Sequence, residues 1–325
     1  MTRTAFDPSK KTVYVLFEND GDHEVFYDKH SRINQLAFPF VYLKEAIEEA
    51  GYNFQPTFDY AGLSRKTDVA YILSLTLLNQ TILESIAKHP REKCFFFNLE
   101  PITTHAVFYS DIMTQYFGKI FVLYDNLVDN RFFFKFYHPQ CNEEVVHPAV
   151  PFEEKKLFVM IQANHFVDHP LSEYAERRKA AAFLSKTGEF DLYGKGWEGY
   201  SSWKGWTKTK TLDVLKNYKF SFVYENMSEQ YGCLSSRLFD AIYAKSVPIY
   251  LGPKNINDYV PSNCFINLKD FPSYEELYQY LKNMDKETYN SYIDAAQAYI
   301  RSPKAEPFST KQFARTIMTH IPKAT

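Results

Sequence analysis

"YKFSFVYENMSEQYGCLSSRLFDAIYAKSVPIYLG" (residues 218–252) is the stretch that decides the fold. It begins with an apolar run typical of a buried strand, continues through a polar loop and a short helical pattern, and ends in a second apolar run that stops at Gly252. Ser235 is suited to cap the helix, because its hydroxyl can accept a hydrogen bond from an exposed backbone N–H two or three positions on. The stretch therefore predicts a strand, a loop, a capped helix and a second strand.

The start of this predicted helix is suited to bind an anion. Its exposed N–H groups and its dipole favour negative charge. Arg237, in the first turn, adds a fork of donors that fits phosphate oxygens. The alternative is a surface arginine on an ordinary capped helix, and the local chemistry by itself leaves both interpretations open.

Similar strand and helix patterns alternate along the rest of the chain. The apolar runs lie at residues 11–20, 69–76, 93–101, 118–125, 157–162, 190–194, 218–225 and 247–251. Nearly continuous apolar strands separated by helices are typical of a parallel sheet covered by helices on both faces. A proline-containing linker at 137–157 separates two such series. We therefore expect two α/β halves with a ligand cleft between them, outside the carboxyl ends of the strands.

The composition fits two globular domains and excludes some functional classes. The chain has 325 residues, of which 45% are hydrophobic and 23% charged, and at ~150 residues per domain this length suggests two domains. A net charge of −2 without a long basic block argues against nucleic-acid binding. The absence of a P-loop and of a G-x-S-x-G pattern argues against kinases and hydrolases.

The sequence favours a cytoplasmic protein. Its apolar runs are much shorter than the ~18 residues that span a bilayer, and its first residues lack the apolar core of a secretory signal. The cysteines are widely spaced and form no C-x-x-C pair, so we expect reduced thiols and neither disulfides nor a zinc site. They are Cys94, Cys141, Cys233 and Cys264.

The motifs around the opening stretch carry a resemblance to a known family. They are Tyr224-Glu225-Asn226, Ser235-Ser236-Arg237, Leu238-Phe239-Asp240-Ala241, Val247-Pro248-Ile249-Tyr250, Gly252, and a tail of Asn255, Ile256, Asp258, Tyr259, Pro261, Phe265 and Ile266. In this order and spacing they resemble the α1,3-fucosyltransferases, glycosyltransferase family 10, in a soluble form of bacterial type. The resemblance is specific over about 55 residues and extends more weakly to the rest of the chain.

The resemblance implies a GT-B fold, in which two Rossmann-like domains face each other across a cleft. Residues 1–153 would bind the acceptor, and residues 154–305 would bind a nucleotide sugar. A final helix within 306–325 is expected to pack back on the first domain. Its alternative role is peripheral contact with the inner membrane.

The resemblance also implies roles for individual residues. Arg237 stands where the family has a lysine that contacts the donor diphosphate, and Arg177 matches a second diphosphate-binding arginine, with Arg178 as the one-residue alternative. Glu100, after a strand of the first half, matches the family's catalytic base; its alternative is an ordinary turn carboxylate. The implied donor-binding residues are Arg177, Tyr218, Lys219, Glu225, Asn226, Ser235, Ser236 and Arg237, and the catalytic ones are Glu100 and Arg237.

The implied reaction is transfer of L-fucose from GDP-fucose to an oligosaccharide or glycolipid acceptor, with inversion and without a metal or other cofactor. One residue departs from the family: Ser236 stands where a glutamate binds the ribose. A different nucleotide sugar is therefore an alternative, with Glu229 as a substitute carboxylate. A non-catalytic module that binds glycans or nucleotides is the alternative from another class.

Two acidic or histidine-containing segments invite a metal interpretation. The DGD at 20–22 and the group His165, Asp168 and His169 both lie among turn formers or next to a proline, so we predict polar loops rather than metal sites. Acceptor selection is expected to depend on the first-half loops at 20–34 and 101–116.

Overall fold

The computed structural model describes residues 6–17, 37–140, 150–207 and 211–324. The chain divides into two compact units: unit 1 is Met1–Cys141 with Pro307–Thr325, and unit 2 is Asn142–Glu306. The predictions for the DGD at 20–22, for the loop at 20–34 and for Cys141 lie outside the described residues.

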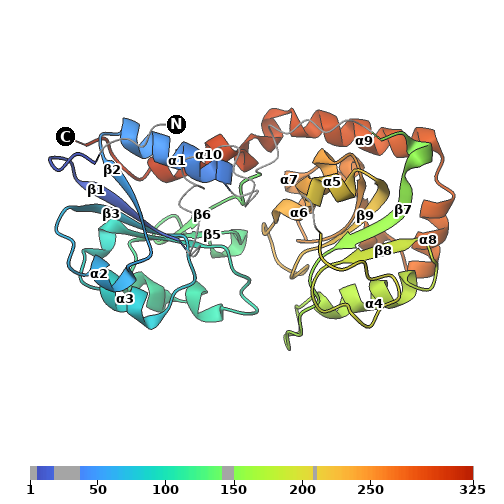
Figure 1. The fold of residues 1–325 in the computed structure, drawn as a ribbon, viewed down its shortest axis with the longest axis horizontal. Helices are drawn as coiled ribbons and strands as arrows, with labels where there is room; N and C mark the ends of the chain where they lie inside the picture. Colours follow the sequence, from blue (N-terminus) through green and yellow to red (C-terminus); the bar gives the residue numbers. More distant parts are fainter. Residues whose placement is uncertain (1–5, 18–36, 141–149, 208–210, 325) are drawn as a thin grey trace. The chain divides into compact units, whose positions relative to one another are not determined.

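Unit 1 is built on a parallel sheet with helices on both faces. The strands, in the order β2-β1-β3-β4-β5-β6, are β1 (Thr12–Leu16), β2 (Asn53–Thr57), β3 (Val69–Ser74), β4 (Cys94–Asn98), β5 (Lys119–Val122) and β6 (Phe133–Lys135). The helices are α1 (Ala37–Glu49), α2 (Tyr60–Leu63), α3 (Gln80–Ile86) and α10 (Thr310–Met318). Figure 1 shows α1 and α10 over one face of the sheet and α2 and α3 over the other.

The C-terminal helix completes unit 1. Helix α10 packs along α1, and the Phe313 ring meets the Phe40 ring edge-on at 6.0 Å. Backbone hydrogen bonds on either side of α10 hold it in place: the N–H of Gln140 donates to the carbonyl of Phe308 at 2.7 Å, and that of Ala324 to the carbonyl of Ala50 at 2.8 Å. The end of the chain thus returns to the first sheet.

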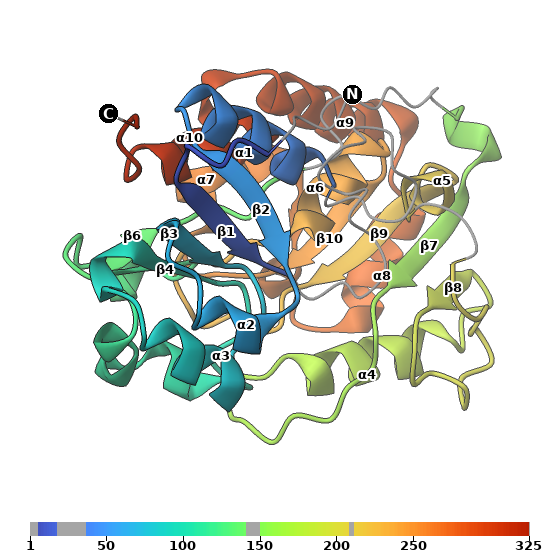
Figure 2. The ribbon, with the colours of Figure 1, turned by 60° about the vertical axis from the view of Figure 1, so that its left-hand side comes forward.

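Unit 2 repeats the architecture with a five-stranded parallel sheet. The strands, in the order β11-β10-β9-β7-β8, are β7 (Lys156–Ile161), β8 (Phe190–Tyr193), β9 (Tyr218–Tyr224), β10 (Val247–Leu251) and β11 (Ile266–Asn267). The helices are α4 (Tyr174–Leu184), α5 (Thr211–Leu215), α6 (Ser236–Tyr243), α7 (Ile256–Tyr259), α8 (Tyr274–Lys282) and α9 (Lys286–Ile300). In Figures 1 and 2, α4 lies on the opposite face of the sheet from α5 and α6.

The alternation of side chains along β7 shows how both faces are covered. Phe158 packs into the cluster that contains Leu184 of α4, whereas Val159 packs with Leu212 and Leu215 of α5. Because helices cover both faces, residues 157–161 of the strand are all apolar. Each such side chain contributes about 1.5–3 kcal/mol through burial.

Each sheet reverses its strand order at one place. In unit 1 the chain runs outward from β1 to β2 and then continues on the other side of β1 with β3; in unit 2 it does the same around β7, between β8 and β9. Ligands of doubly wound sheets bind at such reversals, outside the carboxyl ends of the strands. The expected ligand sites are therefore the carboxyl ends of β1 and β3 in unit 1 and the carboxyl ends of β7 and β9 in unit 2.

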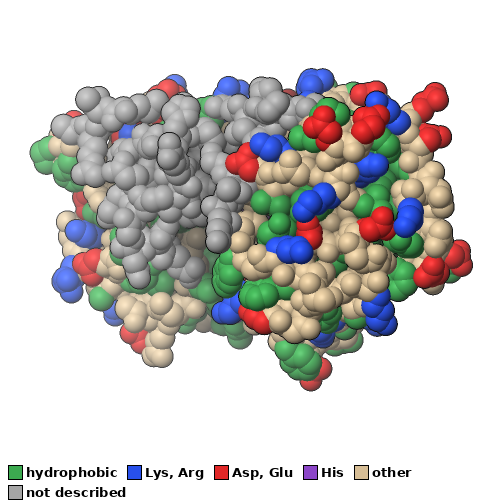
Figure 3. All heavy atoms as spheres, turned by 45° about the vertical axis from the view of Figure 1, so that its right-hand side comes forward, with side chains coloured by type: hydrophobic (Ala, Val, Ile, Leu, Met, Phe, Trp, Pro, Cys, Tyr) green, Lys and Arg blue, Asp and Glu red, His purple; other side chains and the backbone are tan. Residues whose placement is uncertain are grey.

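The surface of the described residues fits the composition. On the face in Figure 3, lysine and arginine side chains are interspersed with acidic ones and form no continuous patch of one sign among the atoms drawn in colour. Within the described ranges, none of the helices is both long and apolar enough to cross a bilayer.

Candidate functional site

A buried carboxylate stands at the carboxyl end of β9. The side chain of Glu225 is only 3% exposed. Its Oε1 accepts hydrogen bonds from the N–H of Ser235, the hydroxyl of Ser235 and the hydroxyl of Tyr250, each at 3.0 Å. Its Oε2 pairs with Nη2 of Arg237 at 2.7 Å. Glu225 thereby ties β9 to β10 and to the first turn of α6.

The charges of this pair stabilise each other. Burial by itself would raise the pKa of Glu225, but the Arg237 charge and the hydrogen bonds from Ser235 and Arg237 outweigh burial and hold the pKa below its ordinary value. Burial lowers the pKa of Arg237, and the neighbouring Glu225 charge more than reverses this. Burial and Glu225 together raise the pKa of the Tyr250 hydroxyl. Glu225 is therefore an anion and Arg237 a cation at neutral pH.

Arg177 brings a second positive charge to the same place. It projects from α4 with 1% exposure, and its Nη2 donates to the carbonyls of Tyr224 at 3.2 Å and Glu225 at 3.0 Å and to Oδ1 of Asn226 at 2.7 Å. Burial, followed by repulsion from Arg237, lowers its pKa to about 10, so it remains charged at neutral pH.

The cluster carries an excess of positive charge. Two guanidinium groups approach Oδ1 of Asn226, that of Arg177 at 2.7 Å and that of Arg237 at 3.5 Å, whereas Glu225 supplies one carboxylate. The cluster lies at the strand reversal between β7 and β9, beside the start of α6. Ser235 caps that helix by accepting from the N–H of Arg237 at 3.4 Å. A net positive charge beside a helix N-terminus favours an anionic ligand.

The structure brings most, but not all, of the predicted donor residues together. Five of them form the cluster: Arg177, Glu225, Asn226, Ser235 and Arg237. A sixth predicted residue, Ser236, lies between Ser235 and Arg237 in the sequence and is half-buried at the first position of α6.

Tyr218 and Lys219 lie at the other end of β9. The seven residues of this strand span roughly 20 Å at about 3.3 Å per residue. The Tyr218 hydroxyl donates to Asp191 at 2.6 Å, and Nζ of Lys219 lies 3.5 Å from the centroid of the Phe152 ring. These contacts hold the amino end of the sheet, and they do not place either side chain at the cluster.

Glu229, the substitute suggested for the missing ribose-binding carboxylate, is held by two lysines. It pairs with Lys269 at 2.8 Å and Lys254 at 2.9 Å. The hydrogen bonds from Lys269 and Lys254 lower its pKa to about 2. Its charge is thus already compensated within the protein.

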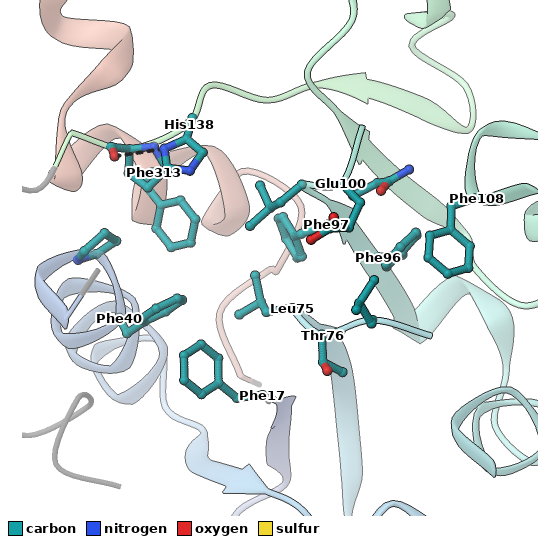
Figure 4. A pocket seen from close by; sticks show the side chains of 15 residues that line it. Phe17, Phe40, Leu75, Thr76, Phe96, Phe97, Glu100, Phe108, His138 and Phe313 are labelled. Carbon is teal, nitrogen blue, oxygen red and sulfur yellow. Dashed lines mark hydrogen bonds between the residues drawn. The ribbon is translucent and has the colours of Figure 1, made fainter. Parts of the chain in front are cut away.

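The candidate base Glu100 belongs to unit 1. It is half-buried just after β4, and its backbone carbonyl accepts a hydrogen bond from the Tyr109 hydroxyl. Its side chain lines a cavity of about 420 Å³ at the ends of β1, β3 and β4 (Figure 4). The cavity thus coincides with the strand reversal of unit 1.

The metal interpretations gain no support from the described residues. No group of three or more histidine, cysteine, aspartate or glutamate side chains is arranged there to hold an ion. His165 and His169 lie in the loop after β7, where Nδ1 of His169 accepts from the N–H of Leu171 at 3.1 Å. Among the described cysteines, Cys94, Cys233 and Cys264, the structure shows no disulfide.

Several residues of the site were not predicted. The side chain of Gln162, after β7, makes two hydrogen bonds to the backbone of Tyr224. Its Nε2 donates to the Tyr224 carbonyl at 2.7 Å, and its Oε1 accepts from the Tyr224 N–H at 3.1 Å. Tyr250, in "VPIYLG", supplies the hydroxyl that binds Glu225. The sequence signal for both is a polar group at the end of an apolar strand.

Three glycines follow β8. Gly194, Gly196 and Gly199 have the G-x-G-x-x-G spacing. No helix begins in this segment, so the structural context of a dinucleotide-binding turn is missing. The first two glycines have positive φ, and a Cβ on Gly194 would lie 2.3 Å from the carbonyl oxygen of Gln162. They allow the loop after β8 to pack against the loop after β7.

Gly252 supports the cluster by leaving room for Tyr250. A Cβ at this position would lie 2.3–2.4 Å from the Tyr250 ring and hydroxyl, and that ring is 1% exposed. We expect Gly252→Ala to push the hydroxyl away from Glu225 and to lower the free energy of unfolding by about 1–3 kcal/mol. Gly199→Ala is the matched control, because its Cβ would meet no atom within 4 Å. Equal denaturation midpoints for the two variants would contradict the packing role.

Residues 153–317 match the family model "Glycosyltransferase family 10 (fucosyltransferase) C-term", a range that contains the whole cluster. The chain is also similar to 4-galactosyl-N-acetylglucosaminide 3-alpha-L-fucosyltransferase 9 of Mus musculus, with 30% identity over 218 residues, which are 66% of this chain and 56% of that protein. The chain thus spans about half the length of this relative.

Solved structures show the same fold at low sequence identity. An α1,3-fucosyltransferase with GDP-fucose aligns with a TM-score of 0.55 and 13% identity, over 100% of this chain and 94% of the other. The T4 phage BGT in complex with UDP-glucose aligns with a TM-score of 0.56 and 12% identity, over 96% and 99%. The predicted GT-B fold, with two parallel-sheet α/β domains, is confirmed.

Proposed function

This chain belongs to glycosyltransferase family 10, and from that premise we propose that it transfers L-fucose from GDP-fucose to a hydroxyl group of a saccharide acceptor, with inversion at the anomeric carbon. The observation that carries the proposal is the positively charged cluster of Arg177, Asn226 and Arg237 at the capped start of α6. Such a cluster suits a diphosphate.

The two arginines take different parts in donor binding. The side chain of Arg237 is 28% exposed, so it is open to a ligand, and its fork of N–H donors can reach phosphate oxygens. Arg177 is 1% exposed and its Nη2 already serves three oxygens of the chain. Arg177 therefore acts through its charge and by holding Asn226, rather than by direct contact.

The proposed reaction is a single displacement. The Glu100 carboxylate takes the proton of the acceptor hydroxyl, the hydroxyl oxygen forms a bond to the anomeric carbon, and the bond from that carbon to the diphosphate oxygen breaks. GDP leaves with the electron pair. Arg237 and the N-terminus of α6 stabilise the negative charge that develops on it, which is the part that a divalent cation plays elsewhere.

A different nucleotide sugar is the second candidate donor. Ser236 replaces the glutamate that the family resemblance places at the ribose, and Glu229 is held by Lys254 and Lys269. The chain therefore lacks the expected carboxylate at that position, which favours testing donors other than GDP-fucose.

Nucleotide titration and product release test the proposal. We expect GDP to bind more tightly than UDP or dTDP in calorimetry, and GDP-fucose to release GDP when a saccharide acceptor is added, with EDTA leaving the rate unchanged. Release from another nucleotide sugar, but not from GDP-fucose, would favour the second donor. Tight nucleotide binding without release under any condition would favour a non-catalytic binding module.

A further inference from the structure

The cavity of unit 1 contains a buried amide that has no hydrogen-bond partner among the described residues. Asn98, the last residue of β4, is 1% exposed and lines the cavity. Neither its Oδ1 nor its Nδ2 makes a hydrogen bond to any residue that the structure describes. Buried amides are almost always paired, because an unpaired donor and acceptor cost free energy. An orphaned amide in a cavity wall therefore indicates a polar ligand.

The rest of the wall is mainly aromatic and uncharged. Six phenylalanines line the cavity: Phe17, Phe40, Phe96, Phe97, Phe108 and Phe313. Figure 4 shows these side chains arranged around the space, with Glu100 on the β4 side. Among the described lining residues there is one carboxylate and neither lysine nor arginine. An anionic ligand is disfavoured, and a neutral ligand with an apolar surface fits.

The volume is large enough for a ring-sized ligand. About 420 Å³ lies within the usual range of small-molecule sites, about 300–1,000 Å³. Aromatic walls with a few convergent polar groups are the usual composition of such sites. Hydroxyl groups that pointed at the phenyl rings would be left unpaired, which is costly. The ligand must therefore turn an apolar face to the rings and direct its hydroxyl groups away from them.

We propose that the amide of Asn98 binds a pair of adjacent hydroxyl groups on a pyranose ring, whose apolar face lies against the phenylalanines of this cavity. One hydroxyl donates to Oδ1, and its neighbour accepts from Nδ2, so a vicinal diol satisfies both orphaned atoms at once. The inference rests on the proposed function in taking this ring to be part of the acceptor.

The placement of Asn98 also suits the reaction. Asn98 and Glu100 are two positions apart at the end of β4, and both line the cavity. A base must lie within hydrogen-bond reach of the hydroxyl that it deprotonates. A ring held by Asn98 through one pair of hydroxyls can present a further hydroxyl to Glu100. Asn98 would then select the acceptor by the position and configuration of its diol.

Small probes separate the diol from the ring. The probes are trans-cyclohexane-1,2-diol, cyclohexanol and methyl β-D-glucopyranoside, and their affinities for the full chain are measured by saturation-transfer NMR. We expect the diol and the glucoside to bind about tenfold more tightly than cyclohexanol. In Asn98→Leu, the affinities for the diol and the glucoside should fall to that for cyclohexanol, and the affinity for cyclohexanol itself should stay the same. Asn98→Leu should melt at or above the wild-type temperature, because it removes an unpaired buried amide.

Ser74→Ala is the matched control. Ser74 ends the neighbouring strand β3 and is fully buried. Its hydroxyl also lacks a hydrogen-bond partner in the described part of the chain, but Ser74 does not line the cavity. Its removal should leave the affinities of all three probes unchanged. The inference is overturned if Asn98→Leu binds the diol as the wild type does, if the wild type does not distinguish the diol from cyclohexanol, or if no probe binds because water fills the cavity.

A titration with GDP distinguishes failure of the proposed function from failure of the diol-binding inference. GDP titration addresses unit 2 only, so absent GDP binding would count against the proposed function and leave the diol result standing. Conversely, if Asn98→Leu transfers fucose with an unchanged acceptor KM, the acceptor ring does not occupy this cavity, although the transferase proposal holds.

Discussion

Replacing Arg237 by alanine is expected to weaken GDP binding about 10- to 100-fold and to lower turnover of bound donor by about 10²–10³-fold. The variant loses the only cluster arginine with a partly exposed side chain among the described residues, and with it the charge that stabilises the departing diphosphate. Arg237→Lys should recover most of the binding, because lysine keeps the charge and loses only the fork geometry. Calorimetry with GDP and single-turnover assays with GDP-fucose give the two quantities.

The same variant should change the pH dependence of stability. In the wild type, the pKa of Glu225 is lowered in the folded state, so Glu225 contributes stability that is present above its ordinary pKa near 4.5 and is lost as the pH falls through the lower, folded value. Arg237→Ala leaves this carboxylate buried with neutral donors only, and should cost about 3 kcal/mol near pH 7. The difference in unfolding free energy between variant and wild type should therefore shrink on acidification.

Lys179→Ala is the control for Arg237. It removes a positive charge from α4 at an exposed site, where Lys179 pairs with Glu176 at 2.9 Å. GDP affinity should stay within about threefold of the wild type, because exposed charges are screened. If Arg237→Ala bound GDP as well as Lys179→Ala does, the diphosphate would have to bind away from this cluster.

Local signals in the sequence were sufficient to predict the strand, loop, helix and strand of residues 218–252. The two apolar runs form β9 and β10, and Ser235 caps α6 as expected. These features depend on neighbours in the chain: a hydroxyl two positions before an N–H, and a nearly continuous run of apolar residues in a strand that helices cover on both faces. Strand β2 could not be predicted in this way, because its sequence, NFQPT, is largely polar and contains a proline. Its place at the edge of the sheet explains why Pro56 is tolerated.

The contacts that make the site could not be predicted in the same way. The sequence singles out Arg177 and Glu225, and the structure brings them together, but the near-complete burial of Arg177 depends on backbone carbonyls 47 and 48 residues away. The aromatic cavity combines side chains from the ends of strands and from α1 and α10, which no local pattern connects. By contrast, the sequence already contained the reason why Tyr218 and Lys219 are remote. They open a strand, and in a parallel sheet the ligands gather where strands end.

Glu100→Gln should lower the rate of fucose transfer by about 10²–10⁴-fold while leaving GDP affinity and thermal stability close to those of the wild type. Glutamine has nearly the same shape and can still hydrogen-bond an acceptor hydroxyl, but it cannot take up its proton. Since glutamine can still bind the acceptor, the loss should appear in kcat, with the acceptor KM close to the wild-type value. Initial rates with GDP-fucose and varied acceptor concentration measure both quantities.

Glu92→Gln is the matched control, since Glu92 is exposed and lies just before β4, at the opposite end of the strand from Glu100. It should transfer fucose at the wild-type rate. An unchanged rate in Glu100→Gln as well would remove Glu100 from the role of base and leave it a carboxylate of the cavity wall. If the rate fell through a higher acceptor KM while kcat stayed unchanged, a different group would be taking the proton and Glu100 would only orient the acceptor. The split between kcat and KM, rather than the loss of rate alone, therefore decides whether Glu100 is the base.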